Sequence, residues 1–134
     1  MTEPAEAERL GPPEPEALRR ARSDARMLRL RCHVFVCNGG SCHRQGAQEL
    51  LALFRSEAAS RSDGRMRVTE TRCTGRCVDV CSVVVYPQGV WYRGVTEDDV
   101  TAIVDRHLAG DALADRAGFV YRDSRFTQAD RKTP

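Results

Sequence analysis

Two tight groups of cysteines constrain this 134-residue chain more than any other feature of its sequence. The first group lies in the first third of the chain, and the second lies near its middle. The six cysteines are Cys32, Cys37, Cys42, Cys73, Cys77 and Cys81. In a compartment that keeps thiols reduced, lasting disulfides are disfavoured, so grouped cysteines indicate metal or redox chemistry.

Length and composition indicate one folded domain between two tails. Hydrophobic residues make up 41% of the chain and charged residues 30%, which suits a soluble domain with one modest core. Residues 1–29 are expected to form a tail, largely disordered or containing a short arginine-rich helix. We expect the folded domain over residues 30–120 and a polar C-terminal tail over residues 121–134.

Charge and hydropathy bear on the partners and location of the chain. The net charge is only +2, and no basic block alternates with aromatic residues, so we expect no nucleic-acid binding. The longest apolar runs are a few residues long, against the roughly 20 that a membrane helix needs, so we expect no membrane association. The first residues do not resemble a signal peptide, and the expected location is the cytoplasm.

The hydrophobic pattern predicts four strands and two main helices. Ser41 is the expected N-cap of the first helix, Thr96 opens the second, and Gly110 is expected to stop it. The order β-α-β-β-β-α implies a thioredoxin-like α/β fold with a central four-stranded mixed sheet. The predicted strands are residues 30–36, 66–71, 83–86 and 90–92. The first predicted helix ends at about residue 59, and the second covers about residues 97–108.

Four of the cysteines have the spacing of a shared metal site. Cys37 and Cys42 form a C-x4-C pair, and Cys73 and Cys77 form a C-x3-C pair about thirty residues later. Both pairs follow predicted strands, and if those strands are parallel neighbours, the pairs meet at one edge of the sheet. Four thiolates suit either a [2Fe–2S] cluster or a structural zinc ion. We favour the cluster, because no C-x2-C pair typical of zinc knuckles is present.

The residues around these cysteines suit a negatively charged cluster. The loop over residues 38–41 contains two glycines, so its backbone N–H groups can turn towards an anion. Arg44, Arg72 and Arg76 flank the cysteines, and positive charge there would raise the reduction potential. Taken singly, each arginine is better explained as a solvated surface residue.

Five segments carry a resemblance to a known family. They are residues 34–37, 41–46, 72–77, 83–92 and 99–108, of which 83–92 is the most specific. In these segments the chain resembles the thioredoxin-like [2Fe–2S] ferredoxins, over about residues 30–120. The fold is also similar to the small iron–sulfur subunit of NADH:quinone oxidoreductase and to related hydrogenase or formate dehydrogenase modules.

The resemblance implies a one-electron carrier that binds one [2Fe–2S] cluster through Cys37, Cys42, Cys73 and Cys77. It also implies redox partner proteins and a possible homodimer, since stand-alone members commonly pair. The C-x4-C loop is closer to the oxidoreductase subunit. The 83–92 run and the short N-terminal region are typical of the stand-alone type, which we favour.

One departure from the family pattern concerns Cys81 and Ser82, where relatives often have Gly-Pro. Cys81 follows Cys77 by four positions, so it could compete as a ligand or replace a lost one. We prefer Cys77, because Cys81 adjoins a strand and is expected to point into the core. Cys32 and Cys81 are therefore interpreted as small buried thiols. The three histidines, His33, His43 and His107, are interpreted as structural residues.

Three other functions stay open at this point. The chain could be the iron–sulfur subunit of a larger NAD(P)H or formate oxidoreductase complex, or a protein with a structural zinc. It could also be a thiol–disulfide enzyme, which would need a C-x-x-C pair at the start of the first helix, and none is present. We therefore expect an electron-transfer protein and not an enzyme.

Overall fold

The computed structural model describes residues 14–129, so our expectations for residues 1–13 and 130–134 lie outside it. Its strands are β1 (Cys32–Cys37), β2 (Met66–Thr71), β3 (Val83–Tyr86), β4 (Val90–Tyr92), β5 (Ala117–Arg122) and β6 (Arg125–Gln128). Its helices are α2 (Glu16–Arg29), α3 (Gly40–Arg44), α4 (Ala47–Arg61), α5 (Glu97–Leu108) and the short 3-10 turns η1 (Cys77–Asp79) and η2 (Ala114–Arg116). In this part of the chain no helix is long and apolar enough to cross a membrane.

The six strands form one mixed sheet in the order β2-β1-β3-β4-β5-β6. β1 and β2 are parallel and pair from Cys32 with Met66 to Cys37 with Thr71, while every other neighbouring pair is antiparallel. The parallel pair is joined through α4, as in a βαβ unit. The expected α/β arrangement is therefore confirmed, and both predicted cysteine loops leave the sheet at the same edge.

The predicted number of four strands was wrong, because the sheet continues through β5 and β6. This hairpin occupies residues that we expected to form a polar tail from residue 121. Its two-residue turn, Asp123 and Ser124, has positive φ angles of 53° and 66°. Such turns are usually marked in a sequence by glycine or asparagine, and neither is present here. Strand β6 is also short and largely exposed, so it carries little hydrophobic signal.

The first predicted helix is divided in two. Gly46 adopts a left-handed conformation with φ 95°, so α3 ends before it and α4 begins at Ala47. Ser41 lies inside α3 and is not the expected N-cap, a position that Gly39 takes instead. The second helix agrees with expectation: Asp99 accepts a hydrogen bond from the N–H of Thr96 at 2.9 Å.

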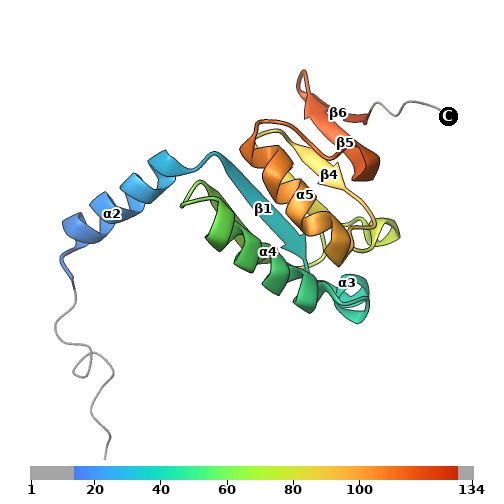
Figure 1. Cartoon of the computed structure of the whole chain (residues 1–134), viewed down its shortest axis with the longest axis horizontal. Helices are drawn as coiled ribbons and strands as arrows, with labels where there is room; N and C mark the ends of the chain where they lie inside the picture. The colour runs from blue at the N-terminus through green and yellow to red at the C-terminus, as the bar shows by residue number, and fades with distance from the viewer. Residues whose placement is uncertain (1–13, 130–134) are drawn as a thin grey trace, which may run out of the picture.

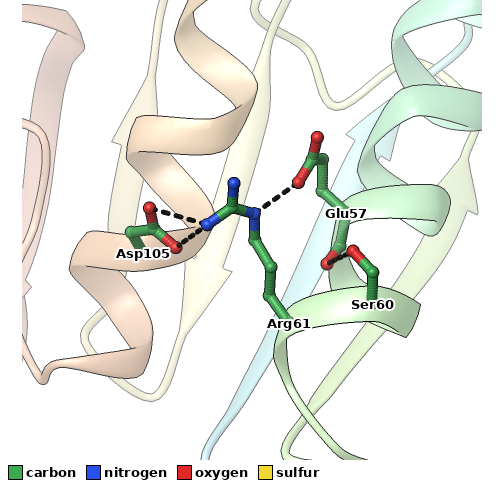
Figure 2. A network of polar contacts seen from close by, with 4 residues as sticks. All are labelled: Glu57, Ser60, Arg61 and Asp105. Carbon is green, nitrogen blue, oxygen red and sulfur yellow. Dashed lines mark hydrogen bonds and ion pairs between the residues drawn. The ribbon is translucent and has the colours of Figure 1, made fainter.

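The core lies between the sheet and helices α4 and α5, which pack side by side on one face of the sheet (Figure 1). The buried side chains of α4 are Ala47, Leu50, Leu51, Phe54 and Ala58, and those of α5 are Val100, Ile103, Val104 and His107. At the surface, Arg61 of α4 binds both carboxylate oxygens of Asp105 of α5 at 3.0 and 3.1 Å and also contacts Glu57 (Figure 2). These side chains are exposed, so we expect them to add little stability.

The sheet face opposite α4 and α5 carries a row of aromatic side chains, and we call it the open face. Strand pairing connects Phe35 with Val84, Val84 with Trp91, Trp91 with Phe119, and Tyr121 with Phe126 across neighbouring strands. Directly paired residues point to the same face of a sheet. Trp91 and Tyr121 each meet the ring of Phe126 edge to face, at 5.6 and 4.9 Å between ring centroids.

Helix α2 stands apart from this body (Figure 1). None of its side chains is buried, although Leu18, Met27 and Leu28 are large and apolar. It is attached mainly at its C-terminal end, where Arg29 donates to the carbonyl of Asp63 at 2.6 Å. The helix allowed by the sequence over this segment is therefore present, outside the packed domain.

Candidate metal centre

The four predicted cysteines come together at the C-terminal ends of the parallel strands β1 and β2. Cys37 is the last residue of β1, and Cys42 lies in α3. Cys73 lies in the loop that joins β2 to η1, and Cys77 is the first residue of η1. All four line one small cavity, together with Gly39, Gly40, Ser41 and Arg76. The convergence that the parallel strands imply is therefore observed in the fold.

The four sulfurs form an inner and an outer pair. Cys37 and Cys42 are each 3% exposed, whereas Cys73 and Cys77 are exposed at the surface. The outer sulfurs are 3.5 Å apart. Within residues 14–129, no three Cys, His, Asp or Glu side chains are grouped closely enough to hold a single metal ion.

The two cysteine loops touch through Gly39. A Cβ atom at Gly39 would lie 2.8 Å from the backbone nitrogen of Cys73 and 2.9 Å from its Cα. Close by, the N–H of Asn38 donates to the carbonyl of Thr71 at 2.8 Å. Glycine at this position therefore allows the loops to approach closely enough to bring the sulfur pairs together.

The pKa values of these thiols indicate the charge of the group that the site can bind. Burial is the largest of the effects that raise the pKa of the Cys42 thiol to about 11, and contact with Cys37 is part of that rise. Cys73 raises the pKa of Cys77, first through their shared hydrogen bond and then through its charge. The N–H of Gly75, 3.3 Å from the Cys73 sulfur, lowers the pKa of that thiol. Four thiolates would repel one another here, so the donor set fits a group that carries metal cations.

Cys81 and Cys32 lie outside this cavity. Cys32 is buried in the core at the other end of β1. Cys81 is 6% exposed, and its sulfur lies 3.8 Å from the carbonyl oxygen of Cys42. Cys81 is therefore buried as predicted, close to the inner pair but not among the residues that line the cavity.

Among the three flanking arginines, Arg76 has a defined place. It lines the cavity, forms an ion pair with Asp79 at 2.8 Å and lies over the ring of Phe119 at 5.1 Å from its centroid. Arg44 donates to the Ser41 hydroxyl at 3.3 Å, and Arg72 is exposed. Arg76 therefore joins the second cysteine loop to β5, a contact that the sequence did not indicate.

The histidines are absent from the cavity, as predicted. His33 binds the Thr69 hydroxyl at 2.6 Å and stacks on Phe35. His43 is exposed and binds the side-chain oxygen of Asn38 at 3.0 Å. His107 is buried and binds the Tyr92 hydroxyl at 2.6 Å. Each ring thus has a structural partner away from the four sulfurs.

The comparisons with known proteins agree with this site. The sequence model of the thioredoxin-like [2Fe–2S] ferredoxins matches residues 27–108. A putative 2Fe–2S ferredoxin of Priestia megaterium is 44% identical over 79 residues, which are 58% of this chain and 61% of that protein. The 2Fe–2S ferredoxin of Clostridium pasteurianum is 37% identical over 99 residues, 67% of this chain and 97% of that protein.

A solved structure supports the same assignment. The crystal structure of the thioredoxin-like [2Fe–2S] ferredoxin of Aquifex aeolicus superimposes with a TM-score of 0.62 and 32% identity. The alignment covers 66% of this chain and 96% of that protein. Helix α2 up to Arg26 and the hairpin β5–β6 lie outside the residues matched by the family's sequence model.

A mixed sheet with four cysteines gathered at the ends of two parallel strands, together with these relatives, defines a small iron–sulfur electron carrier. The chain belongs to the thioredoxin-like [2Fe–2S] ferredoxin family. A [2Fe–2S] cluster is the cofactor of that family, and its members are electron-transfer proteins. The fold, cofactor and general function that we predicted are thereby confirmed.

Proposed function

We propose that Cys37, Cys42, Cys73 and Cys77 bind the [2Fe–2S] cluster. The single observation that carries this proposal is the cavity that these four side chains line together. When bound, the cluster supplies a one-electron couple between its oxidised and reduced forms. Cys37 and Cys42 bury one side of the site, which limits access of water. Cys73 and Cys77 form the side on which a partner can approach.

The chain's own residues also favour the reduced, more negative form of the site. The N–H of Gly75 donates to the sulfur of Cys73 at 3.3 Å, and the guanidinium group of Arg76 lies at the cavity wall. Hydrogen bonds and positive charge near the sulfurs stabilise added negative charge. Because Asp79 offsets the charge of Arg76, we expect the hydrogen bond to have the larger effect.

The division of the chain remains a proposal too: a tail over residues 1–29 and a ferredoxin domain that starts near residue 30. The domain includes β5 and β6, so we place its end after Gln128. We place the protein in the cytoplasm, because all six cysteines are free thiols. We favour a stand-alone carrier; stoichiometric co-purification with a flavoprotein would instead indicate a subunit of a larger oxidoreductase.

We further propose that two copies pair through the open face. Phe126 is 50% exposed and Tyr121 is 43% exposed on this face, beside the partly buried Trp91 and Phe119. Contiguous exposed aromatic side chains are typical of interaction surfaces. A second copy would cover them and would lie next to the second cysteine loop, whose Arg76 contacts Phe119.

Single cysteine-to-serine variants test the ligand assignment. Cys77→Ser should lose or severely weaken the cluster, as should the equivalent change at each of the other three proposed ligands. Cys32→Ser and Cys81→Ser serve as matched controls and should keep the visible absorption of the wild type. A normal spectrum in Cys77→Ser together with a lost spectrum in Cys81→Ser would show that Cys81 is the fourth ligand.

A further inference from the structure

Ser82, the residue before β3, has a buried hydroxyl group for which the fold provides no hydrogen bond. The side chain is 1% exposed, and its oxygen has no hydrogen-bond partner within the described residues. A buried polar group without a hydrogen-bond partner destabilises the folded state. A hydroxyl held in such a place indicates that an acceptor is present when the site is complete.

The strand pairing places this hydroxyl beside the inner cysteines. Val36 pairs with Val83, and the N–H of Cys37 donates to the carbonyl of Ser82 at 3.1 Å. Ser82 and Cys37 are therefore directly opposite each other on neighbouring antiparallel strands. Side chains in such a pair point to the same face, with their Cβ atoms about 4.5–5.5 Å apart.

A second contact brings the same segment close to the other inner cysteine. The sulfur of Cys81, the residue before Ser82, lies 3.8 Å from the carbonyl oxygen of Cys42. The segment that carries Ser82 therefore packs against both inner cysteines.

We propose that the Ser82 hydroxyl donates a hydrogen bond to the sulfur of Cys37 when the cluster is bound, and so raises the reduction potential. The inference rests on the proposed ligand set. A neutral thiol is a weak acceptor, whereas a metal-bound thiolate is a much better one. Because the reduced cluster carries one more negative charge, a donor to its ligand stabilises that form more than the oxidised form. Ser82 is thus a positioning residue that tunes the site without binding iron.

The test is a redox titration of the cluster-bearing protein and its Ser82 variants. Ser82→Ala removes the hydroxyl and should lower the equilibrium constant for reduction several-fold, where tenfold corresponds to about 59 mV for one electron. Ser82→Thr keeps a hydroxyl and should stay closer to the wild type. Ser62→Ala is the matched control, because Ser62 is equally buried but lies after α4, away from the cysteines, and it should leave the potential unchanged.

Iron and sulfide contents, measured on each sample, separate two kinds of failure. A wild type that binds no cluster would contradict the proposed function itself. A fully loaded Ser82→Ala with the wild-type potential would overturn the role of the hydroxyl and leave the ligand set intact. If Ser82→Ala does not load, Ser82→Gly provides a second protein without the hydroxyl. Failure of both to take up the cluster would also overturn the inference, by assigning Ser82 to assembly of the site.

Discussion

The contact between Gly39 and Cys73 shows how single residues make this site possible. The two sulfur pairs come from loops separated by an entire helix and strand, and they meet only because one loop lies against the backbone of the other. Neither partner in this contact can move away easily, since Asn38 and Thr71 are hydrogen bonded just beside it. The φ angle of Gly39 is −71°, which any residue can adopt. Glycine is needed at this position only because a Cβ atom would be too close to Cys73.

We predict that Gly39→Ala pushes the cysteine loops apart. The added methyl would contact backbone atoms of Cys73 at 2.8 and 2.9 Å, and overpacking of this kind costs about 1–3 kcal/mol. Cluster content per chain and the rate of cluster loss under chelator should both reveal the change. Gly40→Ala is the control, since its nearest neighbour would be the flexible end of Arg44 at 3.5 Å. Equal cluster retention in the two variants would contradict this account.

At this scale, much of the site could be predicted from the sequence. Cysteine spacing and the preceding strands were enough to name Cys37, Cys42, Cys73 and Cys77 as neighbours. The contacts of Gly39 and Ser82 could not be predicted, because they depend on how two loops and an antiparallel neighbour meet in three dimensions. The Cys-Ser pair at positions 81 and 82 was a visible departure from relatives, but the sequence alone drew attention to the thiol and not to the hydroxyl.

At the scale of the elements, a buried hydrogen bond between two side chains connects α5 to the sheet. The Tyr92 hydroxyl of β4 binds Nε2 of His107 at 2.6 Å and accepts a hydrogen bond from the N–H of Leu113 at 2.9 Å. Both side chains are 1% exposed. Burial lowers the pKa of His107 to about 4 and raises the pKa of Tyr92 to about 12. The pair is therefore neutral near pH 7.

The His107 pair predicts a defined acid sensitivity. The folded protein resists protonation of His107 until about pH 4, whereas the unfolded chain takes up the proton near pH 6.5. The free energy of unfolding should therefore fall as the pH drops from 6.5 to 4, by about 3 kcal/mol from this group. Urea unfolding followed by circular dichroism measures the slope. His107→Gln should have a shallower slope over that range, and an unchanged slope would exclude His107 as its source.

Some of these elements can be predicted from the sequence more readily than others. The strands over residues 66–71, 83–86 and 90–92 and the helix after Thr96 agree with prediction, because alternation and capping residues are local signals. The break at Gly46 and the hairpin turn at Asp123 and Ser124 depend on positive φ angles. A glycine within a helical pattern is often tolerated, and an Asp-Ser turn has no strong signature, so neither could be read from sequence with the same success.

For the whole molecule, the placement of the helices leaves one face of the sheet to a partner. With α4 and α5 on the other face, Tyr121 and Phe126 stay exposed on the open face. Arg76 of the second cysteine loop lies over Phe119, so the open face borders the proposed cluster site. A pair formed through the open face would contain two electron-transfer sites, one from each copy.

We predict that Phe126→Glu converts this pair to monomers. Phe126 is half exposed at the edge strand, so the change should alter the surface without opening the core, and a buried carboxylate would disfavour pairing. Sedimentation equilibrium at micromolar concentration measures the mass. Leu28→Glu is the control, because Leu28 is 88% exposed on α2, away from the open face. A monomeric wild type, or a pair unaffected by Phe126→Glu, would contradict the proposed interface.

The central claim is that two distant loops bring four sulfurs to one two-iron cluster. The most direct measurement is iron and acid-labile sulfide analysis of the anaerobically purified protein, combined with EPR after reduction. We predict two irons and two sulfides per chain and a single rhombic signal from the reduced cluster. A colourless protein that holds stoichiometric zinc, even when iron and sulfide are supplied, would contradict the account.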